Sequence, residues 1–257
     1  MTQDAVKVRP VRFSHLRAYG QSGMHGRDAQ LRDKDATTAM QRGTAVHAII
    51  FKNRNVCGYP GSQRRGKDFD AFVAEHPDTE ILTMAEYDKA RRMADAVLAS
   101  KTAQPWIQGV TEETLLFRWM GLECRATPDI RGPNFITELK TSNTAHPDRF
   151  VWQARRMGYP AQMVMQRIAC DENGHDKVNA CMIVCVEDKE PYPVTVFQIQ
   201  DNALIAAEKS LILWAERLKV CEQSGEYPPY SNAICPIDIE EEEPMLTFPQ
   251  DDDMVQA

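Results

Sequence analysis

The chain has 257 residues, of which 43% are hydrophobic and 26% charged, and this is enough apolar material for one folded domain with its own core. It contains no apolar run of about 18 residues, and its first residues lack the apolar stretch of a secretion signal, so we expect a cytoplasmic protein without membrane insertion. Its seven cysteines form no CxxC pair, which argues against a disulfide framework, a zinc site and an iron–sulfur cluster.

The formal net charge of −7 is unevenly distributed along the chain. Eight acidic residues and no lysine or arginine lie in residues 238–257, so the rest of the chain is close to neutral and has room for basic patches. We therefore predict a folded domain over residues 1–237 and an acidic, disordered tail over residues 238–257. Within the tail, the segment Met245-Leu246-Thr247-Phe248 is either a docking peptide or part of a solubilising terminus.

The first hundred residues are predicted to be mainly helical. A short helix is expected to begin at Ser14, whose hydroxyl can cap the first turn. Residues 21–35 are polar and are expected to form a loop, and residues 53–67 are expected to form an exposed connection. The other helices expected here have apolar residues at helical spacing or a capping signal such as Thr83, and they cover residues 38–52, 67–75 and 83–99.

The remainder of the chain is predicted to alternate strands with helices. Three short runs of β-compatible residues suggest a strand meander over residues 111–119, 122–130 and 134–141. Helical spacing returns over residues 148–170, where Pro160 predicts a kink or a fresh helix start. Strands are expected at 179–187 and 193–199, before a helix at 201–223. This order predicts an α/β fold with a mixed central sheet flanked by helices.

The strongest chemical pattern is Pro128-Asp129 followed, after eight residues, by Glu138-Leu139-Lys140. A hairpin around Gly132-Pro133 brings Asp129 towards Glu138, and alternation along the strand puts Glu138 and Lys140 on one face. Two carboxylates and the Leu139 carbonyl make a hard-oxygen site suited to Mg²⁺, with Mn²⁺ able to substitute. The lysine is suited to holding a hydroxide or a developing phosphate charge. The alternative is a turn residue followed by an ion pair on a solvated strand.

This pattern resembles the PD-(D/E)XK nuclease superfamily, and within it the branch of lambda exonuclease, exonuclease VIII (RecE) and the RecB nuclease domain. The resemblance covers about residues 13–200 and implies a restriction-endonuclease-like core. In the segment Arg42-Gly43-Thr44-Ala45-Val46-His47, the resemblance makes His47 a further metal ligand beside Asp129, Glu138 and the Leu139 carbonyl.

The segment Gly158-Tyr159-Pro160-Ala161-Gln162 resembles the Y-x-x-Q part of the family's glutamine motif. By resemblance, Gln162 joins Asp129, Glu138 and Lys140 as a catalytic residue. The sequence departs from the fuller Q-x-x-x-Y form, because Gln166 stands where the tyrosine would fall. Gln153 is a weaker candidate for the same role, and either Glu112 or Glu113 is expected near the metal or the DNA. The residues expected to contact DNA are Arg64, Arg65, Lys67, Glu112, Arg155, Arg156 and Tyr159.

The resemblance implies a Mg²⁺-dependent DNA exonuclease that degrades linear double-stranded DNA from its 5′ end in phage-type recombination or repair. It also implies a ring-shaped homo-oligomer, a trimer or tetramer, and a single-strand annealing or single-strand-binding protein as a partner. The alternatives are a structure-selective or single-strand endonuclease on the same core, and a catalytically silent DNA-binding scaffold. An enzyme acting on small phosphorylated molecules is disfavoured, because the sequence has no GxxxxGK[ST] phosphate loop.

Overall fold

The centre of the fold is a five-stranded sheet in the order β3-β6-β7-β8-β9. The computed structural model describes residues 9–32, 36–61 and 63–237. Neighbouring strands run antiparallel except β7 and β8, which are parallel, so the sheet is mixed as predicted. The strands are β3 (Val110–Thr111), β6 (Ile130–Arg131), β7 (Phe135–Ser142), β8 (Ala180–Glu187) and β9 (Val194–Gln198).

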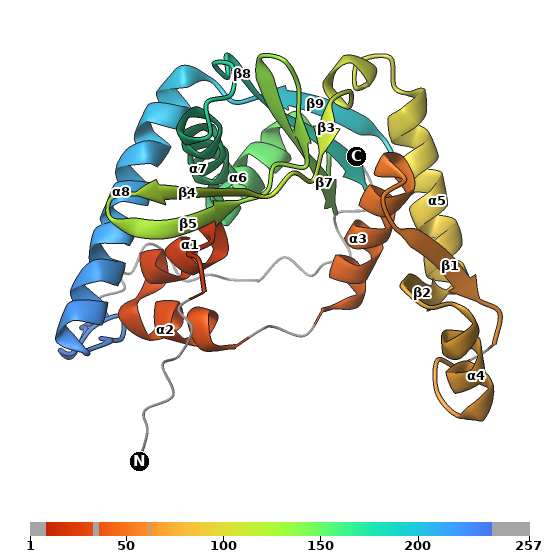
Figure 1. Cartoon of the computed structure of the whole chain (residues 1–257), viewed down its shortest axis with the longest axis horizontal. Coiled ribbons are helices and arrows are strands. Elements are labelled where there is room, and N and C mark those ends of the chain that lie inside the picture. Colours follow the sequence, from red (N-terminus) through yellow and green to blue (C-terminus); the bar gives the residue numbers. More distant parts are fainter. Residues whose placement is uncertain (1–8, 33–35, 62, 238–257) are drawn as a thin grey trace, which may run out of the picture.

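Helices cover both faces of this sheet (Figure 1). On one face pack α3 (Thr38–Phe51) and α5 (Met84–Ala99). On the other lie α1 (Phe13–Gln21), α6 (Pro147–Met157), α7 (Tyr159–Glu172) and α8 (Asp201–Ser224). Alternate residues of β7 point to opposite faces, since Ile136 joins the core beneath α7 while Leu139 joins the core beneath α3 and α5. The odd-and-even alternation therefore turns Glu138 and Lys140 towards α7.

Smaller elements surround this core. The hairpin of β4 (Leu115–Trp119) and β5 (Leu122–Ala126) packs against α7. A parallel pair, β1 (Asn55–Tyr59) and β2 (Thr79–Thr83), packs beside α5, with α4 (Lys67–Glu75) at the far lower right of Figure 1. The remaining elements are α2 (Gly23–Leu31) and the short 3₁₀ helix η1 (Gln104–Trp106).

Most predicted elements are confirmed, including the break before Pro160. Helix α6 ends at Met157, Gly158 follows it with φ +72°, and α7 begins at Tyr159 with the proline in its first turn. The Thr83 hydroxyl accepts a hydrogen bond from the Glu86 amide, as expected of an N-cap. In the part of the chain that the structure describes, no helix is both long enough and apolar enough to cross a membrane.

Three local predictions are wrong. Helix α1 starts at Phe13, so Ser14 lies inside the first turn and is not its cap. The stretch predicted as a loop over residues 21–35 contains α2, because Ser22 caps it and Gly26 lets it pack against the Tyr19 ring, where a Cβ would come within 2.3 Å. The connection predicted over residues 53–67 contains β1, whose partner β2 lies too far along the chain for local pattern to reveal.

The meander is also divided differently from the prediction. The run over residues 111–119 supplies β4 and the end of β3, and the run over 122–130 supplies β5 and the start of β6. Thus each run contributes to two separate sheets, since β4 and β5 leave the central sheet to cover α7. The predicted tail over residues 238–257 lies outside the described residues.

The positive φ of Gly158 generates a prediction about stability. Gly158→Ala should lower the free energy of unfolding by about 1–2 kcal/mol for the left-handed backbone, and by more because its Cβ would lie 3.2 Å from the Phe13 ring. Gly174→Ala is the matched control, since it has φ +70° and no neighbour within 4 Å. Urea unfolding measures both variants. A Gly158→Ala variant that is no less stable than Gly174→Ala would contradict this packing.

Candidate functional site

Glu138 is a buried carboxylate in the middle of the central sheet. Its side chain is 2% exposed and faces α7 together with Lys140. The Lys140 Nζ donates a hydrogen bond to Glu138 Oε2, so the carboxylate has a positive partner on its own strand. A charged pair at this depth requires further polar partners, because desolvation alone would make it unfavourable.

Asp129 lies across the hairpin from this pair. Residues Ile130 and Thr137 are paired in the β6–β7 ladder, so the preceding residue, Asp129, stands opposite Glu138. The Asp129 Oδ2 accepts a hydrogen bond of 2.8 Å from the Leu139 amide. The predicted hairpin around Gly132-Pro133 is confirmed, and it brings both carboxylates and Lys140 together.

Helix α3 contributes His47 to the same place. Its Nε2 lies 3.0 Å from the Leu139 carbonyl oxygen, and its Nδ1 lies 3.6 Å from Asp129 Oδ1. Gly43 in the previous turn suits this close approach, since a Cβ there would lie 3.2 Å from Thr141 Oγ1 of β7. The small residue in the predicted segment thus lets α3 pack close enough for the imidazole to reach the strand.

Helix α7 supplies two amides that hold Glu138. Gln162 Nε2 donates to Glu138 Oε2 at 2.7 Å, and Gln166 Nε2 donates to Glu138 Oε1. The Gln162 Oε1 also accepts from Lys140 at 3.4 Å. Gln166 was not predicted as a site residue, because it was noted only as a departure from the tyrosine of the family's Q-x-x-x-Y motif. The available signal was its spacing of four residues from Gln162, which puts both side chains on one helix face.

The charges in this site are not balanced by its own residues. Burial and, after it, the neighbouring Glu138 raise the pKa of Asp129, while His47 and Lys140 lower it, and the net pKa is about 6. For Lys140, burial lowers the pKa, but Glu138 and Asp129 outweigh it and the net pKa is raised. Lys140 therefore keeps its positive charge. The surroundings of Asp129 hold too little positive charge for its carboxyl to ionise at the pH where a free aspartate does.

These groups fit a divalent cation. The donors are hard carboxylate and carbonyl oxygens, and the raised pKa of Asp129 reflects a site that gains from added positive charge. In addition, Gln166 Oε1 is buried without a hydrogen-bond partner in the described part of the molecule. Among the described residues, no three His, Cys, Asp or Glu side chains are already arranged so that they could hold a metal ion. The ligand roles of His47, Asp129, Glu138 and Leu139 stay predictions.

Tyr159 belongs to the site through its ring. The Lys140 Nζ lies 4.9 Å from the ring centroid, which is the geometry of a cation–π contact. Further along the same face of β7, Gln153 accepts a hydrogen bond of 2.8 Å from Ser142 Oγ and so holds α6 against the end of the strand. Gln153 does not contact Glu138.

A cavity of about 330 Å³ opens beside the two glutamines of α7. It forms because Val11 pairs with β5, where the Arg125 amide donates to the Val11 carbonyl at 2.9 Å, and this brings the start of α1 beside that strand. Its lining contains two arginines and two hydroxyl groups beside the glutamines, and consists of Arg12, Phe13, Ser14, Arg125, Ala126, Thr127, Gln162, Met165 and Gln166. Sequence analysis missed it, since isolated residues from distant segments carry no local signal.

The predicted DNA-binding residues lie in separate places. Arg64 donates to the Ile81 carbonyl at 2.8 Å and to Gln41 at 3.4 Å, so it holds the loop after β1 against β2. Arg65 is exposed and donates to Gln63 in its own loop, and Lys67 begins α4. None of the three contacts the carboxylates, and their DNA-binding role stays a prediction, as does that of the exposed Arg155 and Arg156 on α6.

The two glutamates before β4 differ in position. The Glu112 amide donates to the Asp129 carbonyl at 3.0 Å, while the Glu112 carboxylate accepts from Asn53 at 2.7 Å and Arg54 at 3.3 Å. Glu113 instead pairs with Arg131 at 2.7 Å. Of the two glutamates, Glu112 is thus the one whose main chain is hydrogen-bonded to Asp129.

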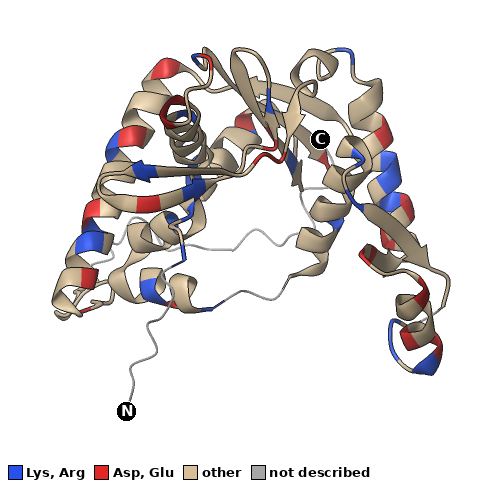
Figure 2. Ribbon diagram, in the orientation of Figure 1, with Lys and Arg blue, Asp and Glu red and all other residues tan. Residues whose placement is uncertain are grey.

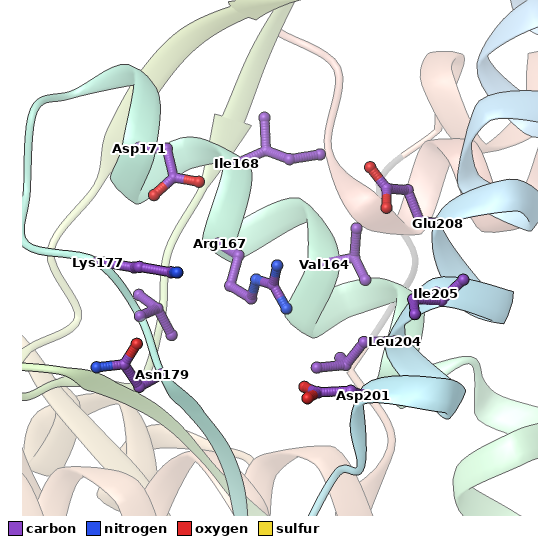
Figure 3. A pocket seen from close by; sticks show the side chains of 11 residues that line it. Val164, Arg167, Ile168, Asp171, Lys177, Asn179, Asp201, Leu204, Ile205 and Glu208 are labelled. Carbon is purple, nitrogen blue, oxygen red and sulfur yellow. The ribbon is translucent and has the colours of Figure 1, made fainter.

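A second cavity, of about 450 Å³, lies between α7 and α8 (Figure 3). Arg167 and Lys177 extend into it, but three carboxylates line it as well, those of Asp171, Asp201 and Glu208. The acidic groups offset the two cations, so this cavity is poorly suited to a polyanion. It shares no lining residue with the cavity beside Gln162.

Comparisons with known proteins agree with this architecture. A solved structure from Eubacterium rectale, named "Putative exonuclease", is 15% identical with a TM-score of 0.64, covering 93% of this chain and 96% of that chain. An alkaline exonuclease from Laribacter hongkongensis is 16% identical and a phage related exonuclease from Haemophilus somnus 129PT is 15% identical. Both have a TM-score of 0.41 and cover 86% of this chain, and the match spans 93% and 98% of their own chains. With a TM-score of 0.64, the Eubacterium rectale structure has the same fold as this chain.

No curated protein matches the chain. A family model described as "PDDEXK-like domain of unknown function (DUF3799)" matches residues 13–237, which is most of the chain and includes every element from α1 to α8. Together with the resemblance of the Asp129, Glu138 and Lys140 motif, this match identifies the chain as a member of the PDDEXK-like family.

Proposed function

We propose that this protein is a metal-dependent deoxyribonuclease that shortens linear double-stranded DNA from its 5′ end. The observation that carries the proposal is the convergence of Asp129, Glu138 and Lys140 at the centre of the sheet, beside a cavity that contains two arginines. Two carboxylates with an adjacent lysine are suited to phosphodiester hydrolysis. A purely structural ion pair would need only one carboxylate beside the lysine.

Each residue of the site has a distinct task in this reaction. Asp129, Glu138, the Leu139 carbonyl and His47 would hold Mg²⁺, or Mn²⁺ in its place, which when bound supplies a Lewis acid that polarises the phosphate and lowers the pKa of water. Lys140 presents a cation to the incoming hydroxide and to the charge that develops on the phosphate. Gln162 and Gln166 act as positioning residues, because their amides fix both oxygens of Glu138.

The cavity beside the glutamines supports a terminal phosphate as the point of attachment. A 5′-phosphate carries up to about two negative charges and several acceptor oxygens, which suit the guanidinium groups of Arg12 and Arg125 and the hydroxyls of Ser14 and Thr127. Figure 2 shows Lys and Arg positions along the ribbon of α1 and of the β4–β5 hairpin, and the hairpin contributes Arg125 to the cavity. Binding of an end would place the first phosphodiester bond near Glu138.

Other aspects of the proposal rest on the family resemblance. They are a role in phage-type recombination or repair, a ring-shaped homo-oligomer, and an annealing or single-strand-binding protein as partner. A structure-selective or single-strand endonuclease is the second candidate, and it would cut a closed circle or an internal junction that an end-binding enzyme leaves intact.

The catalytic assignment predicts a loss of activity with the fold retained. Asp129→Asn and Glu138→Gln should each lower Mg²⁺-dependent degradation of linear duplex DNA by more than about 100-fold, since each removes one anionic ligand. Asp95→Asn on the exposed face of α5 is the control and should have no effect. Purified variants are compared by release of label from DNA, with circular dichroism as the test of folding. Undiminished cleavage in both site variants would refute the assignment.

The raised pKa of Asp129 predicts a stability change in metal-free protein. Because the folded pKa of about 6 lies above the ordinary value of 3.8, the folded state holds its proton more tightly, and stability decreases as pH rises from about 4 through 6. Asp129→Asn removes this proton linkage. In EDTA, the unfolding free energy of the variant relative to the native chain should therefore increase between about pH 4 and pH 7. A difference that is flat across this range would contradict the assigned pKa shift.

The cavity predicts a specific preference for the chemistry of the DNA end. Arg12→Ala and Arg125→Ala should each reduce the preference for 5′-phosphate over 5′-hydroxyl duplex ends by about 10-fold, because each removes a charge-assisted hydrogen bond. Arg118→Ala, on the exposed face of the same hairpin, is the matched control. Initial rates on duplexes labelled at either end measure the preference, with a closed circle included. Equal preference in all variants would show that the cavity does not bind the terminal phosphate.

A further inference from the structure

Helix α6 exposes an aromatic ring flanked by two arginines. The helix buries Phe150 and Ala154 against the core, while Arg149, Trp152 and Arg156 are exposed. Spacings of three and four residues put these three side chains on one continuous stripe. We call Arg149, Trp152 and Arg156 the α6 stripe.

The stripe has no evident structural role. Trp152 is 69% exposed, whereas Trp106, Trp119 and Trp214, the other tryptophans of the chain, are partly buried against the two cores. Neither Arg149 nor Arg156 makes a side-chain ion pair or hydrogen bond with any residue that the structure describes. A large exposed ring beside uncompensated charges gains little for the folded state in water.

The charge on the helix is positive. Its sequence, PDRFVWQARRM, contains three arginines and one aspartate, and the aspartate, Asp148, lies in the first turn. Arg17 of α1 adds another cation at the far end, where its Nη2 lies 3.6 Å from Met157 Sδ. The surface therefore suits an anionic ligand.

The stripe lies next to the carboxylate site. Gln153, which follows Trp152, accepts the hydrogen bond from Ser142, and Ser142 lies on the same face of β7 as Lys140 and Glu138. Helical spacing puts Arg149 and Arg156 on the turns directly before and after Gln153. Ser142 lies two residues beyond Lys140 on β7, so this side of α6 borders the strand that carries Glu138 and Lys140.

We propose that the α6 stripe binds single-stranded DNA, with an unpaired base stacked on Trp152 and the neighbouring phosphates paired with Arg149 and Arg156. Exposed aromatic rings between basic side chains bind single strands because every base has a stackable face and every linkage a negative charge. In an intact duplex the base faces are occupied by their neighbours, so the tryptophan selects the unpaired strand. The proposal rests on the proposed nuclease function, since that activity brings DNA to this surface.

A protein partner or a second copy of the chain is the competing occupant. Arginine and tryptophan are common at protein interfaces as well, so the composition of the stripe does not separate the two occupants. The net positive charge of the helix favours DNA, because it complements the phosphates of a strand. The continuity with the carboxylate site favours DNA as well, whereas nothing about a protein interface requires this position.

The test measures binding without cleavage. A fluorescent oligothymidylate of about 20 nucleotides is titrated in EDTA with the full chain and with Trp152→Ala, Trp152→Phe and Leu213→Ala. Leu213 is the matched control, since it is 63% exposed on α8. Trp152→Ala should bind about 10-fold more weakly, Trp152→Phe should retain most of the affinity, and the control should be unchanged. Oligonucleotide binding should quench tryptophan fluorescence in the native chain and not in Trp152→Phe.

The arginines predict a second readout. The double variant Arg149→Ala/Arg156→Ala should lower the slope of log affinity against log salt concentration by about 1.4, because each single-strand phosphate contact contributes about 0.7. The affinity for blunt duplex DNA should change less than that for the single strand in Trp152→Ala.

The outcomes separate this inference from the nuclease proposal. Weaker single-strand binding in Trp152→Ala supports the stripe even if the native chain cleaves nothing with Mg²⁺, a result that would sink only the nuclease proposal. Unchanged single-strand affinity in Trp152→Ala overturns the inference. So does a change of sedimentation coefficient in Trp152→Ala with DNA affinity intact, which would make the stripe a protein interface.

Discussion

The hydrogen bonding of one buried carboxylate organises this site. Glu138 is almost fully removed from water, and an unpaired charge at such a depth would cost several kcal/mol. Lys140 supplies the opposite charge, and Gln162 and Gln166 supply amide donors to both oxygens. The position of α7 relative to β7 is therefore fixed by polar contacts as well as by the apolar core beneath it. Breaking any one of these contacts would leave a buried charge less well solvated.

Two glycines shape how the helices approach β7. Gly43 lets α3 lie against β7, so that His47 contacts the main chain at Leu139, and Gly158 turns the chain between α6 and α7. The same turn divides the tasks of the two helices. Helix α7 faces Glu138 with its amides, whereas α6 is tied to the end of β7 by Gln153 and leaves its other side in solvent. This one change of direction thus gives α7 its contacts with Glu138 and leaves one side of α6 exposed.

The parts of the fold that the sequence predicted are those with a local signal. The break at Pro160, the Thr83 cap and the strands around Glu138 each depend on residues within one turn or one hairpin. Helix α2 and strand β1 were not predicted, because α2 is stabilised by packing on Tyr19 and β1 by a partner 24 residues later. Propensity carries no information on such contacts.

The candidate site shows the same division. Asp129, Glu138 and Lys140 lie in one hairpin, and their convergence followed from the turn at Gly132-Pro133 and from alternation along the strand. His47 required the resemblance to a family, since a histidine on a partly apolar helix has no pattern of its own. The cavity of Arg12 and Arg125 requires the pairing of Val11 with β5, a contact across more than a hundred residues of sequence. The role of Gln166 was within reach, because its spacing from Gln162 was visible.

The central claim is that the two carboxylates close around a divalent cation. The most direct measurement is a crystal structure of the protein with Mn²⁺, in which anomalous scattering locates the ion independently of any assumed geometry. The account predicts a peak within about 2.0–2.4 Å of oxygens from Asp129, Glu138 and the Leu139 carbonyl. A protein that cleaves DNA with Mn²⁺ but shows its ion elsewhere, with Glu138 still bound only to Lys140 and the two glutamines, would contradict it.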